Sequence, residues 1–147
     1  MATVEVTFTP LPAHVRTARL VATAVARRSG VDEALLDEVR LAVGEACSRA
    51  VEAHRRHCPA EPVKIEMTDQ GERFVVVVSD QAPTSTAAQP DANGRGVATL
   101  VQGGDDVGIP AGFGLAVISG LADDVHVSST SSGVSVRMSW PSAAPTA

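Results

Sequence analysis

Residues 112–124 read GFGLAVISGLADD, a glycine turn that leads directly into a short apolar helix predicted to end at about Leu121. Gly112 and Gly114 let the backbone approach a ligand closely and adopt positive φ angles at little steric cost. The helix that follows offers unpaired N–H groups and the positive end of its dipole, both of which favour a phosphate. Taken alone the pattern is weak, because a loop-to-helix turn that binds nothing has the same residues. The rest of the chain decides between these interpretations.

Apolar periodicity predicts the elements upstream of this turn. Alternating apolar and polar residues are typical of half-buried strands. Apolar residues spaced by three and four positions are typical of a helix with one buried face, and Asp32 is placed to cap the longer of two such helices. The predicted strands are residues 4–9, 63–68 and 73–79, and the predicted helices are residues 15–29, with Gly30 as the C-terminal cap, and 33–57.

Two hairpins are predicted from turn residues between alternating segments. Residues 69–72 (DQGE) join strands 63–68 and 73–79, and residues 130–133 (TSSG) join two last strands, 125–129 and 133–140. Short turns rich in glycine and polar residues favour antiparallel pairing of their flanking strands. The valine run in 73–79 predicts a central strand covered on both faces.

This order of elements predicts an α+β fold. We expect a two-layer sandwich, in which a mainly antiparallel, mixed sheet is covered on one face by helices. One domain is predicted for residues 1–140, followed by a disordered tail at 141–147. Residues 81–111 contain several prolines and glycines and no long apolar pattern, so they are expected to form either a functional lid or a disordered loop.

Charge argues against nucleic acid as a partner. The net charge of the 147 residues is −5, whereas nucleic-acid-binding domains are usually basic. Residues 16–56 nevertheless hold eight of the twelve basic residues. This helical region is interpreted either as a surface that meets an acidic protein partner or as a set of solvated arginines.

No membrane segment and no metal site are predicted. The chain has no run of about twenty apolar residues and no signal peptide, so a cytoplasmic location with reduced Cys47 and Cys58 is expected. These cysteines, with His54 and His57, form a C-x6-H-x2-H-C pattern that matches no common zinc-ligand spacing.

Three motifs together carry a resemblance to a known superfamily. They are EACSRA at residues 45–50, Asp80 at the end of the valine strand, and GFGL at residues 112–115. In these motifs and in its predicted elements, the chain resembles the GHKL (Bergerat-type) ATPases, and within them the bacterial anti-sigma-factor serine kinases of the RsbW and SpoIIAB type. The resemblance extends from about residue 4 to residue 140.

The resemblance implies a general base at Glu45 and a magnesium ligand at position 49, where the family has asparagine. Magnesium requires oxygen ligands, whereas the Arg49 guanidinium has only N–H donors and a permanent positive charge. Magnesium is therefore expected to be lost here. The i,i+4 spacing predicts an ion pair between Glu45 and Arg49, which would occupy the base. Alternatively, Arg49 contacts the phosphates directly and replaces the charge of the metal.

The resemblance also implies a nucleotide pocket built from two glycine motifs. Asp80 would accept a hydrogen bond from the adenine amino group, but the glycines that follow it in the family are replaced here by Gln81, Ala82 and Pro83. The proline and alanine remove backbone freedom at this point. The second glycine motif would hold the phosphates and is intact; its residues are Gly112, Gly114 and Leu115.

Arg16 and Arg19 fall on the first predicted helix, where the family presents an arginine to its protein partners. An arginine fork suits bidentate contact with a carboxylate. The implied partners are a sigma factor, a STAS-domain anti-anti-sigma protein, or both, and homodimerisation is a further state that the resemblance implies.

Two functions follow. The first, favoured by Arg49 and the lost glycines, is an anti-sigma-factor-like switch that binds proteins with weakened or absent kinase activity. The second is a working serine/threonine kinase that phosphorylates a STAS-domain partner, as the presence of Glu45, Asp80 and the second glycine motif would allow. ATP binding, weak or lost, is compatible with either function.

Overall fold

A computed structural model of the chain describes residues 3–82 and 117–142. The predicted elements within these residues are all present, with bounds that differ by at most three residues. The predicted lid (81–111), apart from residues 81 and 82, and the tail beyond residue 142 lie outside the described part. The elements are β1 (Thr3–Phe8), α1 (Pro12–Arg28), α2 (Glu33–His57), β2 (Val63–Asp69), β3 (Arg73–Ser79), β4 (Asp124–Thr130) and β5 (Gly133–Pro141), with a short helix at 117–121.

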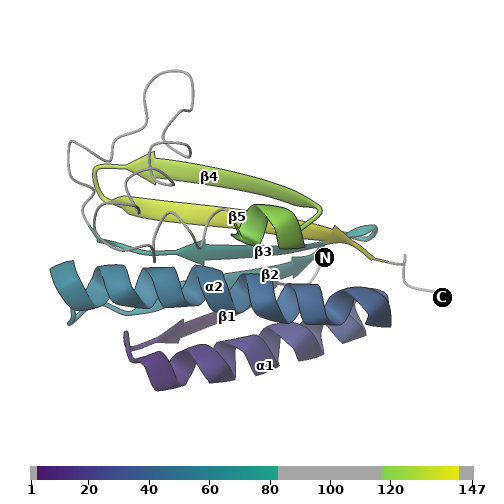
Figure 1. The fold of residues 1–147 in the computed structure, drawn as a ribbon, viewed down its shortest axis with the longest axis horizontal. Helices are drawn as coiled ribbons and strands as arrows, with labels where there is room; N and C mark the ends of the chain where they lie inside the picture. Colours follow the sequence, from purple (N-terminus) through teal and green to yellow (C-terminus); the bar gives the residue numbers. More distant parts are fainter. Residues whose placement is uncertain (1–2, 83–116, 143–147) are drawn as a thin grey trace.

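The five strands form one sheet in the order β1-β2-β3-β5-β4 (Figure 1). Every pairing between described strands is antiparallel, and the two predicted hairpins, β2–β3 and β4–β5, are confirmed. Helices α1 and α2 lie side by side on one face of the sheet, with α2 in contact with β2, β3 and β5 (Figure 1). The predicted α+β two-layer sandwich is therefore confirmed.

The valine strand β3 is central, as its sequence predicts. Phe74, Val76 and Val78 are buried beneath the helices. On the opposite face Val75 is only 3% exposed, whereas Val77 is half-buried. The prediction that both faces are covered is thus correct for part of the strand only, because no described helix packs on the second face.

Helix α2 begins and packs as its sequence predicts. The Asp32 carboxylate accepts a hydrogen bond from the Ala34 N–H at 2.9 Å and so caps the first turn. Gly30, just beyond α1, has a φ of 91° and supplies the left-handed residue that ends that helix. The buried stripe of α2 includes Leu36, Val39, Val43, Ala46 and Ala50.

The short helix at 117–121 is attached to the sheet through two large residues. Ile118 is fully buried in the core. The indole N–H of Trp140, on β5, donates to the Leu121 carbonyl oxygen at 3.0 Å. These contacts fix the helix that directly follows the second glycine motif.

Within residues 3–82 and 117–142, none of the helices has the length and apolar character that crossing a membrane requires.

Candidate functional site

A buried ion pair joins α2 to the end of β3. The Arg49 guanidinium donates through Nη2 to Oδ2 of Asp80. The side chains of Arg49 and Asp80 are 8% and 1% exposed, respectively. Because water does not screen charges at this depth, the pair attracts more strongly than a surface pair would, and each charge depends on the other for its stability.

The other oxygen of Asp80 holds two backbone amides. Oδ1 accepts hydrogen bonds from the N–H groups of Ala82, at 3.1 Å, and Val134, at 3.2 Å. The Asp80 N–H itself donates to the Val134 carbonyl oxygen at 2.9 Å. Asp80 therefore links α2, the end of β3 and the start of β5, and both of its oxygens are engaged inside the protein.

The predicted ion pair between Glu45 and Arg49 is wrong. Among the described residues Arg49 pairs with Asp80, while Glu45 is exposed to solvent and is in no ion pair. Helical spacing predicts only neighbours on α2 itself. The fold brings the buried carboxylate of Asp80, the residue after β3, within reach of Arg49. Arg49 uses its Nη2 for this pair, whereas its Nε–H is buried and has no hydrogen-bond partner in the described part of the chain.

Gly133 allows β5 to start against the backbone of Asp80. Its φ is 150°, and a Cβ placed there would lie 2.0 Å from the Asp80 carbonyl oxygen. Any side chain at this position would overlap that carbonyl. The glycine is thus required by the close approach of the two strands at the ion pair.

His54 holds the segment that follows Asp80, a role that the sequence pattern did not reveal. The imidazole is fully buried; its Nε2 accepts from the Gln81 N–H at 2.8 Å, and its Nδ1 lies 2.8 Å from the Glu61 carbonyl oxygen. Since an amide N–H only donates and a carbonyl only accepts, the ring is neutral with its hydrogen on Nδ1. One signal was available: His54 stands four residues after Ala50, at the next position of the apolar stripe.

The cysteines and histidines of the C-x6-H-x2-H-C pattern differ in their surroundings in the fold. Cys47 is fully buried in the core, and both ring nitrogens of His54 are hydrogen-bonded. Within the described ranges no group of three or more His, Cys, Asp or Glu side chains is placed to hold a metal ion.

The two free thiols are expected to differ sharply in reactivity. Burial raises the pKa of Cys47 to about 12, although the nearby Arg19 charge opposes the rise. The pKa of Cys58 is also raised, by burial and then by the Asp80 and Glu61 charges. Because only the thiolate reacts, titration of the native protein with a disulfide reagent at pH 8 should label Cys58 slowly and Cys47 only after denaturation.

The raised pKa of Cys47 also affects the stability of the folded protein at alkaline pH. Because the pKa of Cys47 is higher in the folded than in the unfolded chain, this thiol lowers stability progressively as the pH rises from about 9 towards 12 and has no such effect below. In the labelling experiment described above, equal rates for Cys47 and Cys58 in the native protein would contradict the burial of Cys47.

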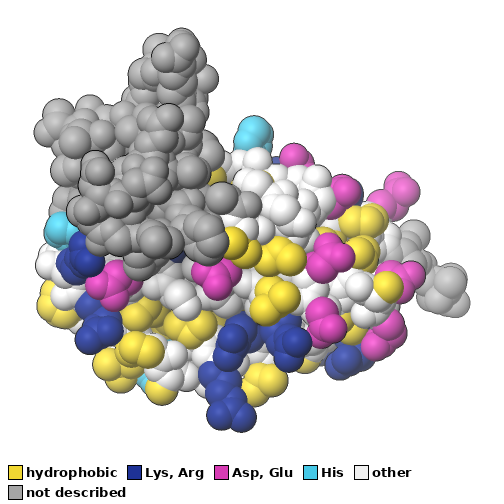
Figure 2. Space-filling view, viewed as in Figure 1, with side chains coloured by type: hydrophobic (Ala, Val, Ile, Leu, Met, Phe, Trp, Pro, Cys, Tyr) yellow, Lys and Arg dark blue, Asp and Glu magenta, His cyan; other side chains and the backbone are white. Residues whose placement is uncertain are grey.

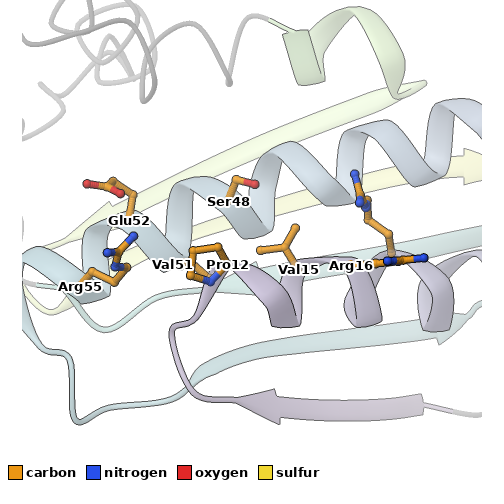
Figure 3. Close-up of a pocket in the computed structure, with 8 residues that line it drawn as sticks. Pro12, Val15, Arg16, Ser48, Val51, Glu52 and Arg55 are labelled. Carbon is orange, nitrogen blue, oxygen red and sulfur yellow. The ribbon is translucent and has the colours of Figure 1, made fainter.

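Arg16 and Arg19, the predicted partner-binding residues, line a groove of about 330 Å³ between α1 and α2. Figure 3 shows Pro12, Val15 and Arg16 on one side of it and α2 side chains on the other. Basic side chains also gather over the helical side of the molecule in the space-filling view (Figure 2). We call this the arginine groove; its lining residues are Pro12, Val15, Arg16, Arg19, Ser48, Val51, Glu52 and Arg55.

Gly44 lies against the side chain of Arg19, which lines this groove. A Cβ at Gly44 would lie 2.6 Å from Cδ of Arg19, so the Arg19 stem crosses α2 where that helix has no side chain. Glycine inside a helix costs about 1 kcal/mol relative to alanine, and the passage of Arg19 accounts for its presence. The remaining candidates, Gly112, Gly114 and Leu115, lie outside the described residues.

The relationship of the chain to known proteins agrees with this architecture. The model of a family described as the histidine kinase-like ATPase domain matches residues 8–140. The chain belongs to this family. Because the family is named for an ATPase domain, ATP binding is the general expectation for its members.

One similar solved structure is that of the RsbU and RsbW domains of Rv1364c from Mycobacterium tuberculosis, with a TM-score of 0.63 and 15% sequence identity. The match covers 99% of this chain and 35% of that one, so the chain spans about a third of its length. At this identity the likeness establishes the fold. None of the curated proteins gives a significant match.

Neither side chain of the ion pair between Arg49 and Asp80 offers a free ligand for a magnesium ion. The Arg49 guanidinium has only N–H donors and a positive charge, whereas magnesium requires oxygen ligands. The only carboxylate that contacts Arg49 among the described side chains, Asp80, is already neutralised by it and holds two amides. Any ligand donor that approached Asp80 would have to compete with these internal hydrogen bonds.

Proposed function

We propose that this histidine kinase-like ATPase domain is a regulatory binding protein of the anti-sigma-factor type. It binds a sigma factor, a STAS-domain anti-anti-sigma protein, or both in turn, and its magnesium-dependent kinase activity is weakened or lost. The observation that carries the proposal is the buried ion pair between Arg49 and Asp80.

The ion pair supports binding over catalysis for an electrostatic reason. Phosphoryl transfer needs a divalent cation to offset the charge of the phosphates. Here a fixed positive charge, Arg49, stands at the position to which the resemblance assigns a metal ligand, and it neutralises the neighbouring Asp80 carboxylate. Protein binding requires neither a metal nor a free Asp80, and Arg16 and Arg19 supply cationic side chains on α1 for that purpose.

An active serine kinase is the alternative, and one observation favours it. The Glu45 carboxylate is exposed and lies outside the ion pairs of the described residues. A carboxylate in that state can accept the proton of a substrate serine hydroxyl once the hydroxyl is within hydrogen-bond reach.

A binding screen combined with a kinase assay separates the two functions. The purified protein is tested for capture of the STAS-domain proteins and sigma factors of its own cell, and then for transfer of labelled phosphate from ATP to each captured STAS protein. Stable capture without magnesium-dependent transfer supports the proposal. Strong transfer that requires magnesium and is abolished by Glu45→Ala would overturn it.

Replacing Arg49 by asparagine is expected to strengthen magnesium-ATP binding. Asparagine supplies an oxygen ligand, removes the positive charge and frees the Asp80 carboxylate. Calorimetry should show affinity for magnesium-ATP at least about tenfold higher than that of the unmodified protein, equivalent to about 1.4 kcal/mol.

Arg49→Met is the matched control, because it removes the same charge and supplies no oxygen. It should gain less affinity than Arg49→Asn, and its gain should not depend on magnesium. Equal affinities in the unmodified protein and Arg49→Asn, with both folded by circular dichroism, would refute our account of this position.

A further inference from the structure

We propose that His54 is a proton-controlled latch for the segment that follows β3. The neutral imidazole holds the backbone of Gln81, and the protonated imidazole releases it. Gln81 and Ala82 stand where the resemblance places the first glycine motif. The latch therefore lets pH change the course of the chain beside the predicted nucleotide pocket. It does not depend on the proposed function, because neither a partner protein nor a nucleotide takes part in it.

The latch depends on one nitrogen lone pair. His54 is fully buried near the C-terminal end of α2. Its Nε2 accepts a hydrogen bond from the Gln81 N–H, with 2.8 Å between the two nitrogens. An amide N–H cannot accept a hydrogen bond, so Nε2 must carry no hydrogen for this contact to exist. Protonation of Nε2 places one N–H group against another and removes the bond.

The other ring nitrogen cannot take up the incoming proton. Nδ1 lies 2.8 Å from the Glu61 carbonyl oxygen, which only accepts, so Nδ1 already carries the hydrogen of the neutral ring. A further proton must therefore bind at Nε2, the atom that holds Gln81. Because Nδ1 remains a donor after protonation, the ring keeps its bond to Glu61 and releases Gln81 alone.

On the strand side, the negative charge closest along the chain is already satisfied. Asp80, the residue before Gln81, binds Arg49 and two backbone amides with its two oxygens. β5 starts with uncharged residues, and Lys64 of β2 lies on the sheet face away from the helices, beside Glu66. Among the described strand residues, a protonated ring finds no unpaired carboxylate on the helical side of the sheet.

On the helix side, the nearby groups are either uncharged or exposed to solvent. Burial and then neighbouring negative charges raise the pKa of Cys58, so its thiol stays neutral in acid. Arg55 and His57 flank His54 on α2 and are exposed, as is the Glu61 carboxylate, whose charge solvent screens. A buried charge without a partner is costly. The protonated ring therefore favours the released arrangement, in which water reaches Nε2.

The direction of the pH effect follows from these contacts. Histidine commonly gains its proton between about pH 8 and pH 5. The latch is closed at the upper end of this range, where the ring is neutral and Gln81 is bound, and it opens as the pH falls through the protonation of the ring. The ion pair between Arg49 and Asp80 uses no histidine, so it should persist. The release is thus local, unlike acid unfolding.

NMR of the isotope-labelled full chain between pH 8 and pH 5 tests the latch. Nitrogen shifts of the His54 ring report protonation of Nε2, and hydrogen exchange reports the protection of the Gln81 amide relative to an unstructured peptide at the same pH. We expect this protection to fall at least about tenfold, with the same midpoint as the ring titration. The Val134 amide, which Asp80 holds at 3.2 Å, should keep its protection.

His54→Gln provides an acceptor that does not titrate. The glutamine side-chain oxygen can accept from the Gln81 N–H in place of Nε2, so protection of this amide should become independent of pH. His57→Gln is the matched control, because His57 also lies on α2 but is exposed. This variant should keep the pH dependence of the unmodified protein.

Four outcomes would overturn the inference. They are a ring that stays neutral throughout the titration, ring protonation with unchanged protection of Gln81, loss of protection at Gln81 and Val134 with one midpoint, and unchanged pH dependence in His54→Gln. The first three are read from the unmodified protein, so they decide the question even if His54→Gln fails to fold. The kinase assay tests the proposed function separately.

Discussion

Asp80→Ala is expected to lower the free energy of unfolding by about 3–5 kcal/mol, because it leaves a buried guanidinium without its counter-charge. It also removes the acceptor of the Ala82 and Val134 amides, which are themselves buried. Urea denaturation followed by circular dichroism measures the loss. Asp37→Ala is the control, because Asp37 pairs with Arg40 on the surface of α2, where its side chain is 83% exposed. That change should cost less than about 1 kcal/mol.

A double-mutant cycle tests whether Arg49 and Asp80 act as a unit. Asp80→Asn keeps an oxygen for the two amides and removes the negative charge, while Arg49→Met removes the positive charge. The double variant should be more stable than the sum of the single losses predicts, by about 1–3 kcal/mol. Additive losses would contradict a coupled ion pair. Urea denaturation gives the free energy of unfolding of the unmodified protein, of both single variants and of the double variant, each from one cooperative transition.

Gly133→Ala is expected to cost about 3 kcal/mol or more, through positive φ and overlap with backbone atoms. The alanine methyl would lie 2.0 Å from the Asp80 carbonyl oxygen, so the hairpin β4–β5 must move away from β3. This movement would also break the bond between the Val134 N–H and Asp80. Thermal unfolding measures the effect.

Two other glycines separate the contributions to this cost. Gly71 has a φ of 87° but open space around it, so Gly71→Ala reports the strain of the dihedral angle alone, about 1 kcal/mol. Gly120 lies in the helix at 117–121 with open space and should be neutral or slightly stabilised by alanine. If Gly133→Ala costs no more than Gly71→Ala, the close approach to Asp80 is not what requires the glycine.

These residues also show how far the sequence could predict the site. The motif resemblance predicts Glu45, Arg49 and Asp80 as site positions, and their roles stay predictions. The fold places Arg49 against Asp80. The predicted partner of Arg49 was wrong, because helical spacing considers only neighbours four residues away. His54 was considered only as a metal ligand, although its position on the apolar stripe indicated a buried role.

The sequence by itself determined which segments become helices and strands, where the hairpins turn and which face of α2 is buried. Periodicity, capping and turn preferences depend on residues that are close along the chain, so they can be read without coordinates. Only the tertiary structure decided which charges meet. The partner of Arg49 lies 31 residues away, at the end of β3, and the arginine groove exists only where α1 lies against α2. Such contacts depend on how whole elements pack, and on which charges that packing removes from water.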